Sequence, residues 1–173
     1  MPECTVCGNW FQVPTKESKF FNIESEVFCS LNCLLSYIKA SQPFDFCTLP
    51  QIELATTDCF GIGEPSCYSL RLNTNFRSMF EVVVAETFVL LEKFRLRYEP
   101  FVITLNNQSG KEFHYLPDFY FPDHGIILEV KGGWRGGGMK RFRAAKALLN
   151  NRLILIPSFY RRWFNSRLKD VSE

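Results

Sequence analysis

The stretch from Tyr115 to Trp134, YLPDFYFPDHGIILEVKGGW, decides the fold of this chain. Residues 115–121 are dense in aromatic side chains, which favour extended strands. Residues 121–125 contain Pro, Asp and Gly, which are typical of turns, and residues 126–131 form a second apolar run. The pattern predicts a β-hairpin.

Charged side chains interrupt the apolar pattern at the middle of this hairpin. Side chains alternate across a strand, so Glu129 and Lys131 are expected on one face, opposite the apolar set Ile126, Leu128 and Val130. Asp118, on the partner strand, can reach the same place. Buried carboxylates and ammonium groups are costly unless they are compensated. A divalent cation held by the carboxylates, with the lysine aimed at a phosphate, would compensate them.

The order of these residues resembles a known enzyme superfamily. Pro117-Asp118, ten intervening residues and then Glu129-Val130-Lys131 resemble the active-site hairpin of the PD-(D/E)XK nucleases. The wider series adds Ser78-Met79-Phe80-Glu81 ahead of a helix, Tyr98-Glu99-Pro100 before a strand, and Trp134 after the lysine. It is similar to phage endonuclease I-type enzymes, which resolve Holliday junctions, and to TnsA-type transposon end nucleases. The similarity covers roughly residues 76–157.

The resemblance and the periodicity together predict an α/β (α+β) fold with a restriction-endonuclease-like core. Apolar residues recur at helical spacing over 76–94 and again over 139–150. A strand is expected over 98–105, and the continuous apolar run 153–156 predicts a central strand covered on both sides. The order helix, three strands, helix, strand gives a mixed central sheet. The expected domains are a zinc finger at 1–42, an irregular connector at 43–74, and a nuclease domain with a basic tail at 75–173.

The resemblance also implies roles for individual side chains. Glu81, Asp118 and Glu129 would bind one or two Mg²⁺ (or Mn²⁺) ions, with the backbone carbonyl of Val130 as a further ligand. Lys131 would position or deprotonate the attacking water, or contact the phosphate. Products would carry 5′-phosphates, and a homodimer is expected because the family frequently cuts two strands as a dimer.

Two of the acidic residues, Glu81 and Glu99, have alternative interpretations. Ser78 and Glu81 also satisfy the capping-box pattern, in which the glutamate completes the start of a helix. We favour the metal role for Glu81 because Asp118 and Glu129 follow it. Glu99 is either a supporting carboxylate or a paired surface charge.

The N-terminal segment contains a four-thiolate pattern, Cys4-x2-Cys7 and Cys29-x3-Cys33. Soft thiolates at this spacing select zinc, and four protein ligands make the site structural. Ser30 is placed to cap a helix that runs to about Lys39. The segment resembles the FCS-like (MYM-type) zinc fingers. Whether such a finger would bind DNA or a protein partner stays open.

Three other cysteines lie in the connector and complete an odd total of seven. Cys47, Cys59 and Cys67 could form most of a second metal site. Their spacing matches no zinc ribbon, and free cysteine is among the most frequently buried residue types, so ordinary buried thiols are the preferred interpretation.

Basic residues are concentrated after the hairpin. Trp134 and Arg135 lie in a glycine-rich loop whose backbone can approach a phosphate closely. In the following helix, basic residues are expected on one DNA-facing side (Lys140, Arg143 and Lys146) and small or apolar residues on the inner side (Ala144, Ala147 and Leu148). Arg161 and Arg162 lie in an aromatic tail that either contacts DNA or docks as a closing helix with its arginines extended to solvent.

The bulk composition limits the classes of function. The chain has 173 residues, 46% of them hydrophobic, and a net charge of only +2, so it is not polybasic as a whole. It shows neither a membrane-spanning run nor a signal pattern, and we expect a cytoplasmic protein of a phage or its bacterial host. The expected function is metal-dependent endonucleolytic cleavage of DNA. The alternative is a non-catalytic DNA- or protein-binding module with a nuclease-like fold.

Overall fold

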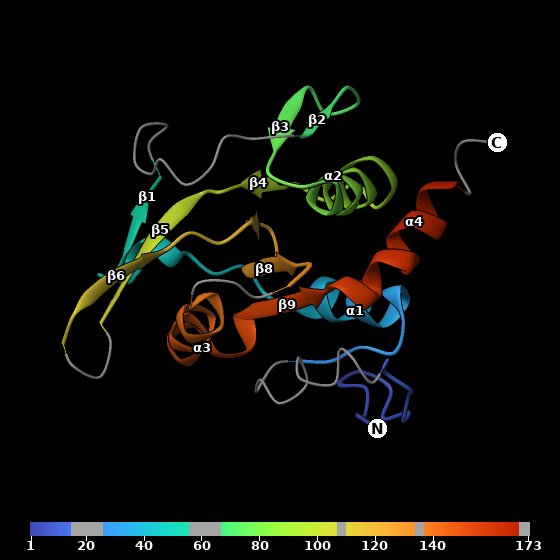
Figure 1. The fold of residues 1–173 in the computed structure, drawn as a ribbon, viewed down its shortest axis with the longest axis horizontal. Coiled ribbons are helices and arrows are strands. Elements are labelled where there is room, and N and C mark those ends of the chain that lie inside the picture. The colour runs from blue at the N-terminus through green and yellow to red at the C-terminus, as the bar shows by residue number, and fades with distance from the viewer. Residues whose placement is uncertain (15–25, 56–66, 107–109, 134–136, 170–173) are drawn as a thin grey trace.

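The computed structural model describes residues 1–14, 26–55, 67–106, 110–133 and 137–169 (Figure 1). Over these ranges the protein has a mixed α+β fold with four α-helices and nine short strands. This confirms the broad class that the sequence predicted. No helix in the described ranges combines the length and the apolar character needed to cross a membrane.

The described strands form three sheets. The first has the order β1-β5-β6, with bounds Ile52–Leu54, Phe101–Asn106 and Glu112–Tyr115. The second pairs β2 (Cys67–Ser69) with β3 (Thr74–Phe76). The third has the order β4-β7-β8-β9, with bounds Arg97–Tyr98, Phe119–Phe121, Ile126–Lys131 and Leu153–Pro157. Because β8 runs antiparallel to β7 and parallel to β9, the third sheet is mixed.

The helices lie around the third sheet (Figure 1). The α-helices are α1 (Leu31–Ala40), α2 (Met79–Glu86), α3 (Gly138–Leu149) and α4 (Arg161–Lys169). Shorter turns are η2 (Phe46–Thr48), η3 (Thr87–Leu91), η4 (Asn150–Arg152) and η5 (Ser158–Tyr160). The predicted cap of α1 is confirmed, since the Ser30 hydroxyl accepts a hydrogen bond from the Cys33 backbone N–H at 3.2 Å.

The predicted hairpin is formed by β7 and β8, which pair Phe121 with Ile126 across the turn. The predicted alternation is also confirmed. Ile126, Leu128 and Val130 join one hydrophobic cluster with residues of α1, α2 and α4. Ile127, on the other face, joins a second cluster with residues of α3. The sheet therefore separates two cores.

The first strand of the hairpin is shorter than predicted. Strand pairing over 115–121 is interrupted, because β6 ends at Tyr115 and β7 begins at Phe119. Pro117 lies in the gap and has no backbone N–H to donate to a neighbouring strand. As a result Tyr115 belongs to the first sheet, with β5 as its neighbour, rather than to the third.

The prediction for residues 153–156 is half right. All five residues of β9 are buried, and they alternate between the first cluster (Ile154, Ile156) and the second (Leu153, Leu155). Among the described strands, however, β9 pairs only with β8 and so lies at an edge of the sheet. Because both faces of β9 are covered, this edge strand has the continuous apolar sequence that is typical of a central strand.

The N-terminal segment packs into the same core as the rest of the chain. Leu34 and Ile38 of α1 are fully buried in the first cluster. The Phe28 backbone N–H donates to the Tyr160 hydroxyl at 2.9 Å. Residues of the predicted connector also contribute structure, since β1 pairs with β5 in the first sheet. The expected boundaries at 42/43 and 74/75 therefore do not divide the packing.

The inward face of α3 differs from the predicted one. Phe142, Ala145 and Leu149 are the buried apolar residues of this helix, whereas Ala147 is exposed. The predicted face was rotated by about one residue because a helix rich in alanine and basic residues has a weak apolar stripe, which makes its phase hard to read.

Candidate functional sites

The four cysteines predicted to bind zinc lie together. Their sulfur atoms are all within 4.8 Å of one another. The Cys29 sulfur lies 3.6 Å from the sulfurs of both Cys7 and Cys33. Sulfurs bound to one tetrahedral zinc at about 2.3 Å would lie about 3.8 Å apart. The donor type and the spacing both fit a structural zinc ion.

Local backbone contacts bring the two cysteine pairs side by side. The Gly8 N–H donates to the Cys4 carbonyl at 3.0 Å, and the positive φ of Gly8 (70°) lets the chain turn back tightly. The Thr5 N–H donates to the Val27 carbonyl at 2.8 Å, which places the first pair beside the second. Ser30 then starts α1, whose first turn carries Cys33.

The electrostatics of the cysteine cluster also favour a cation. Burial tends to raise the pKa of Cys4, but backbone N–H groups around its sulfur outweigh this and lower the pKa to about 6. Burial and the neighbouring cysteines raise the pKa of Cys29 to about 12. Crowded thiols cannot all ionise without a counter-charge, and a bound metal ion supplies one.

The connector cysteines do not join a metal-binding group in the described part of the chain. Cys47 is exposed at η2, and Cys67 is half-buried at the start of β2. Cys59 lies outside the described residues. The preferred interpretation of Cys47 as a buried thiol was therefore wrong, because its side chain faces solvent.

Asp118, Glu129 and Lys131 lie at one end of the β7–β8 hairpin. Asp118 immediately precedes β7, and Glu129 and Lys131 lie near the end of β8. The side chains of Asp118 and Glu129 are buried, with residue exposures of 7% and 2%. The Val130 backbone N–H donates to Oδ2 of Asp118 at 2.7 Å. The Lys131 ammonium forms an ion pair with Oε1 of Glu129. The convergence that the hairpin predicted is present.

The charges of this group influence one another strongly. Burial raises the pKa of Asp118 well above its usual range, and the nearby Glu129 carboxylate raises it further. Burial alone would lower the pKa of Lys131, but Glu129 and Asp118 outweigh burial and raise it. The neighbouring acidic groups therefore favour the protonated form of Lys131 in this structure.

Glu81 caps the N-terminus of α2, as the capping-box interpretation predicted. Its backbone N–H donates to the Ser78 hydroxyl at 3.2 Å, and that hydroxyl donates to Oε1 of Glu81 at 2.7 Å. Oε2 accepts from the Tyr98 hydroxyl at 2.7 Å and from the Arg77 N–H at 3.1 Å. The Glu81 charge also raises the pKa of Asp118, so the capping role does not remove Glu81 from the acidic group.

Glu99 lies beside this group as a paired charge. Its carboxylate forms an ion pair of 2.7 Å with Arg77. Its N–H donates to the Asp118 carbonyl at 2.9 Å, which fixes the two segments together. Burial raises the pKa of Glu99, while Arg77 opposes the shift.

The three carboxylates do not form a ready-made ligand set. In the described ranges, the cysteine cluster is the one group of three or more potential ligand side chains close enough to share an ion. Carboxylate oxygens are the right donors for Mg²⁺ or Mn²⁺. To share an ion, the three carboxylates would have to lie closer together than they do in this structure.

Two tyrosines at the site were not predicted. Tyr115 donates to Oε2 of Glu129 at 2.6 Å, and Tyr98 donates to Oε2 of Glu81 at 2.7 Å. Each therefore holds one candidate ligand. Tyrosine is common in strands, so a single sequence offers no signal that separates these two residues from ordinary core tyrosines.

The predicted DNA-binding residues fall into different environments. Lys140 and Arg143 are exposed on α3, and Arg161 and Arg162 are exposed on α4. Lys146 is buried instead, with 9% exposure, and its ammonium contacts Glu26 at 2.6 Å and the Leu153 carbonyl at 2.8 Å. Its expected place on the DNA-facing side was wrong, because α3 turns it toward the sheet.

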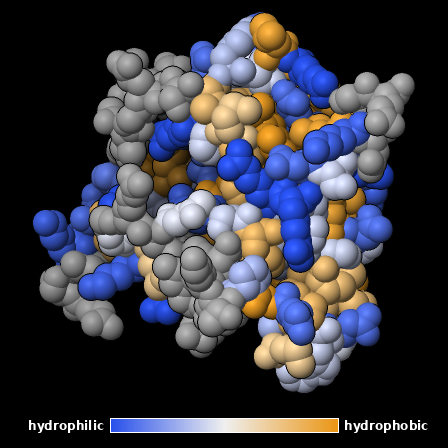
Figure 2. All heavy atoms as spheres, turned by 45° about the vertical axis from the view of Figure 1, so that its right-hand side comes forward, coloured by the Kyte–Doolittle hydropathy of each residue, from blue (hydrophilic) through white to orange (hydrophobic). Residues whose placement is uncertain are grey.

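The tail docks as a closing helix, α4, which is one of the two alternatives that the sequence predicted. Phe164 of α4 is fully buried and packs against Phe80 of α2, with ring centroids 6.2 Å apart. Hydrophilic side chains gather on the side of the molecule that carries α4 (Figure 2). Trp134 and Arg135 lie outside the described residues.

No protein-family model, no curated protein and no solved structure matches this chain.

Proposed function

We propose that this protein is a metal-dependent endonuclease that hydrolyses DNA phosphodiester bonds on a restriction-endonuclease-like core. The observation that supports this most is the convergence of Asp118, Glu129 and Lys131 at one end of a hairpin. The order α2, β7–β8 hairpin, α3, β9 is also the order that the PD-(D/E)XK resemblance implies.

The buried charges argue that the group serves chemistry rather than stability. Burial and the nearby glutamates oppose the ionised form of Asp118, although the Lys131 ammonium and the Val130 N–H favour it. One ammonium group cannot balance several buried carboxylates, and a bound metal ion would supply further positive charge. Perturbed carboxylates beside a lysine are characteristic of functional sites.

Asp118 and Glu129 would hold the metal, with Glu81 and the Val130 carbonyl as further ligands. A bound Mg²⁺ or Mn²⁺ ion would lower the pKa of a water and stabilise charge on the phosphate. Lys131 would contact a phosphate oxygen, or position or deprotonate the attacking water. The Tyr115 hydroxyl holds Glu129 in place, and the Val130 N–H holds Asp118.

A non-catalytic binding module is the second candidate. It is favoured by the hydrogen bonds that occupy both oxygens of Glu81 and by the ion pair on Glu129. In this reading the charges form a self-contained network, and the exposed arginines of α4 would bind DNA without cleavage.

Zinc binding by Cys4, Cys7, Cys29 and Cys33 is part of the proposal in either case. The ion would hold the N-terminal turn against α1. Since α1 is part of the first core, the zinc site would stabilise the folded chain and not a separate module.

A cleavage assay distinguishes the two candidates. Linear duplex, nicked duplex, four-way junction and single-stranded DNA would be incubated with Mg²⁺ or Mn²⁺. The proposal predicts cleavage by the wild type, none by Lys131→Ala, and unchanged cleavage by Lys93→Ala, which alters an exposed lysine away from the site. DNA binding without cleavage of any substrate would favour the non-catalytic module.

A further inference from the structure

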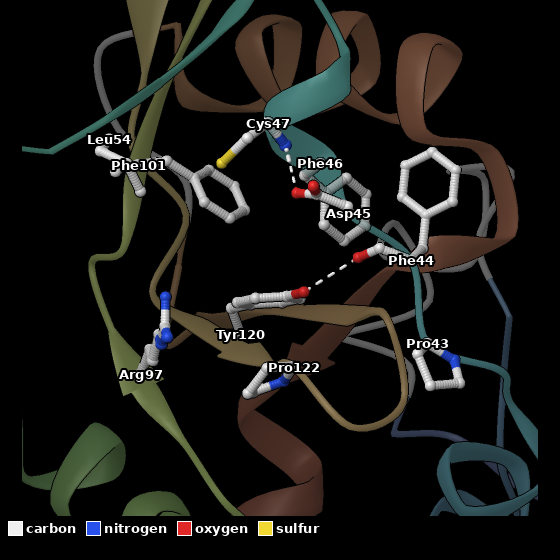
Figure 3. Close-up of a pocket in the computed structure, with 10 residues that line it drawn as sticks. All are labelled: Pro43, Phe44, Asp45, Phe46, Cys47, Leu54, Arg97, Phe101, Tyr120 and Pro122. Carbon is white, nitrogen blue, oxygen red and sulfur yellow. Dashed lines mark hydrogen bonds between the residues drawn. The ribbon is translucent and has the colours of Figure 1, made fainter.

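A cavity of about 360 Å³ lies on the same face of the third sheet as Glu129. Its floor is formed by the buried rings of Phe46, Phe101 and Tyr120 (Figure 3). Ile127, the cross-strand partner of Tyr120, precedes Glu129 by two positions in β8. Side chains two apart in a strand share a face, so the cavity floor and the acidic group lie along one surface.

The aromatic floor is rigidly held. The ring of Phe46 lies 5.7 Å from that of Phe101 and 5.4 Å from that of Tyr120, measured between centroids. The Tyr120 hydroxyl donates to the Phe44 carbonyl at 2.9 Å. These contacts fix the positions of the three rings, and a volume of roughly 300 Å³ or more is typical of ligand pockets.

The rim of the cavity is polar and exposed. Figure 3 shows Arg97 on one side of the cavity, with Asp45 and Cys47 on another. Four other arginines each form an ion pair with a carboxylate: Arg71, Arg77, Arg95 and Arg167. The backbone of Arg97 pairs with Tyr120, but its guanidinium has no ion-pair or hydrogen-bond partner among the described residues. Oδ1 of Asp45 accepts from the Cys47 N–H at 3.0 Å, which leaves its second oxygen to accept from a ligand.

These groups match the parts of a nucleotide. Aromatic rings stack on a base, an arginine binds a phosphate, and a carboxylate accepts from an N–H donor on the base edge. We propose that this cavity binds one unpaired nucleotide of the DNA substrate, with its base over the aromatic floor and its phosphate at Arg97. The inference rests on the proposed nuclease function and names its substrate class, which is DNA with an unpaired base near the cleavage point.

The position of the cavity supports this substrate class. Tyr120 follows Asp118 by two residues, a separation of about 7 Å along a strand. Stacked nucleotides are spaced by about 3.4 Å along one strand of a duplex. A nucleotide in the cavity would therefore lie only a few positions from a phosphate at Asp118. A fully paired base cannot enter, because it must first leave the stack.

The test compares two duplexes that differ only in whether one base is unpaired. Binding would be measured without Mg²⁺ or Mn²⁺ for the wild type, Arg97→Gln and Lys93→Gln, which removes an equal charge elsewhere. Arg97 and Lys93 are both exposed, so both variants are expected to fold. We expect Arg97→Gln to weaken binding of the unpaired duplex about tenfold, the loss of one charge-assisted contact. The paired duplex and Lys93→Gln should show little change.

Cys47 provides a second measurement at the same rim. A mixed disulfide tethered to the unpaired base should exchange with the Cys47 thiol and release its small thiol, whereas the same group on a paired base should not. Equal weakening of both duplexes by Arg97→Gln, or no preference in cross-linking, would overturn the pocket and leave the proposed cleavage intact. Failure of the folded wild type to bind any DNA would overturn both.

Discussion

The hydroxyl of Tyr115 donates a hydrogen bond of 2.6 Å to Oε2 of Glu129, and both side chains are buried. The two residues belong to different sheets, because Tyr115 ends β6 and Glu129 lies in β8. This contact leaves Oε1 as the oxygen that faces Lys131. Tyr115 thus sets the orientation of the carboxylate at the centre of the proposed site.

Replacing Tyr115 with phenylalanine should weaken divalent-metal binding. Loss of a hydrogen bond that orients a ligand typically lowers metal affinity by about 10–100-fold. Mn²⁺ titration followed by electron paramagnetic resonance would measure the change. Tyr120→Phe is the matched control, since it removes a tyrosine hydroxyl that contacts the Phe44 carbonyl instead. Equal affinities for Tyr115→Phe and wild type would show that the contact is only structural.

Glu81→Gln separates the capping role of this residue from a metal role. Glutamine keeps an oxygen that can accept from the Tyr98 hydroxyl and the Arg77 N–H, and it suits a capping box. We therefore expect the thermal midpoint to change little while cleavage falls at least about tenfold. Retained cleavage would assign Glu81 to the helix cap alone.

Removing one zinc ligand should unfold more than the N-terminal turn. Cys29→Ser should lose the bound zinc, and the melting temperature should fall, because the cysteine cluster leads directly into the buried helix α1. Zinc content by mass spectrometry and thermal denaturation would measure the two effects. Cys47→Ser, at an exposed thiol outside the cluster, should change neither. A Cys29→Ser protein with full zinc content would contradict the assignment.

The hairpin turn should not tolerate a side chain at Gly125. Its φ is +57°, and an added Cβ would lie 2.6 Å from the Phe44 backbone nitrogen. Gly125→Ala should destabilise the protein by about 1–3 kcal/mol through crowding, in addition to backbone strain. Gly110→Ala separates the two causes, because Gly110 has a similar φ of +77° but no atom within 4 Å of the added Cβ. Equal losses in chemical denaturation would show that strain alone is responsible.

The sequence predicted those features that depend on local pattern. Alternation in 126–131 was enough to place Glu129 and Lys131 on one face, and paired cysteines were enough to locate the cluster. Contacts between distant segments were not accessible in this way. The Lys146 ion pair joins residues 120 positions apart, and Tyr160 reaches Phe28 across 132. Such pairs depend on how the two cores pack, which periodicity within one element does not specify.

The cavity beside Tyr120 was hidden for the same reason. Its lining combines η2 from the predicted connector with β4, β5 and β7 of the predicted nuclease segment. Nothing in the spacing of residues 43–54 indicates that they would pack against Arg97. Cys47 was expected to be buried, but it lies at the rim.

Binding of Mn²⁺ at Asp118 tests the central proposal most directly. Asp118→Asn keeps an oxygen for the Val130 N–H but removes the carboxylate charge. Asp123→Asn makes the same change at an exposed turn residue. With zinc already bound at the cysteines, the wild type and Asp123→Asn should bind Mn²⁺ and cleave DNA, and folded Asp118→Asn should do neither. Equal Mn²⁺ binding by all three proteins would contradict a metal site at Asp118 and favour the non-catalytic module.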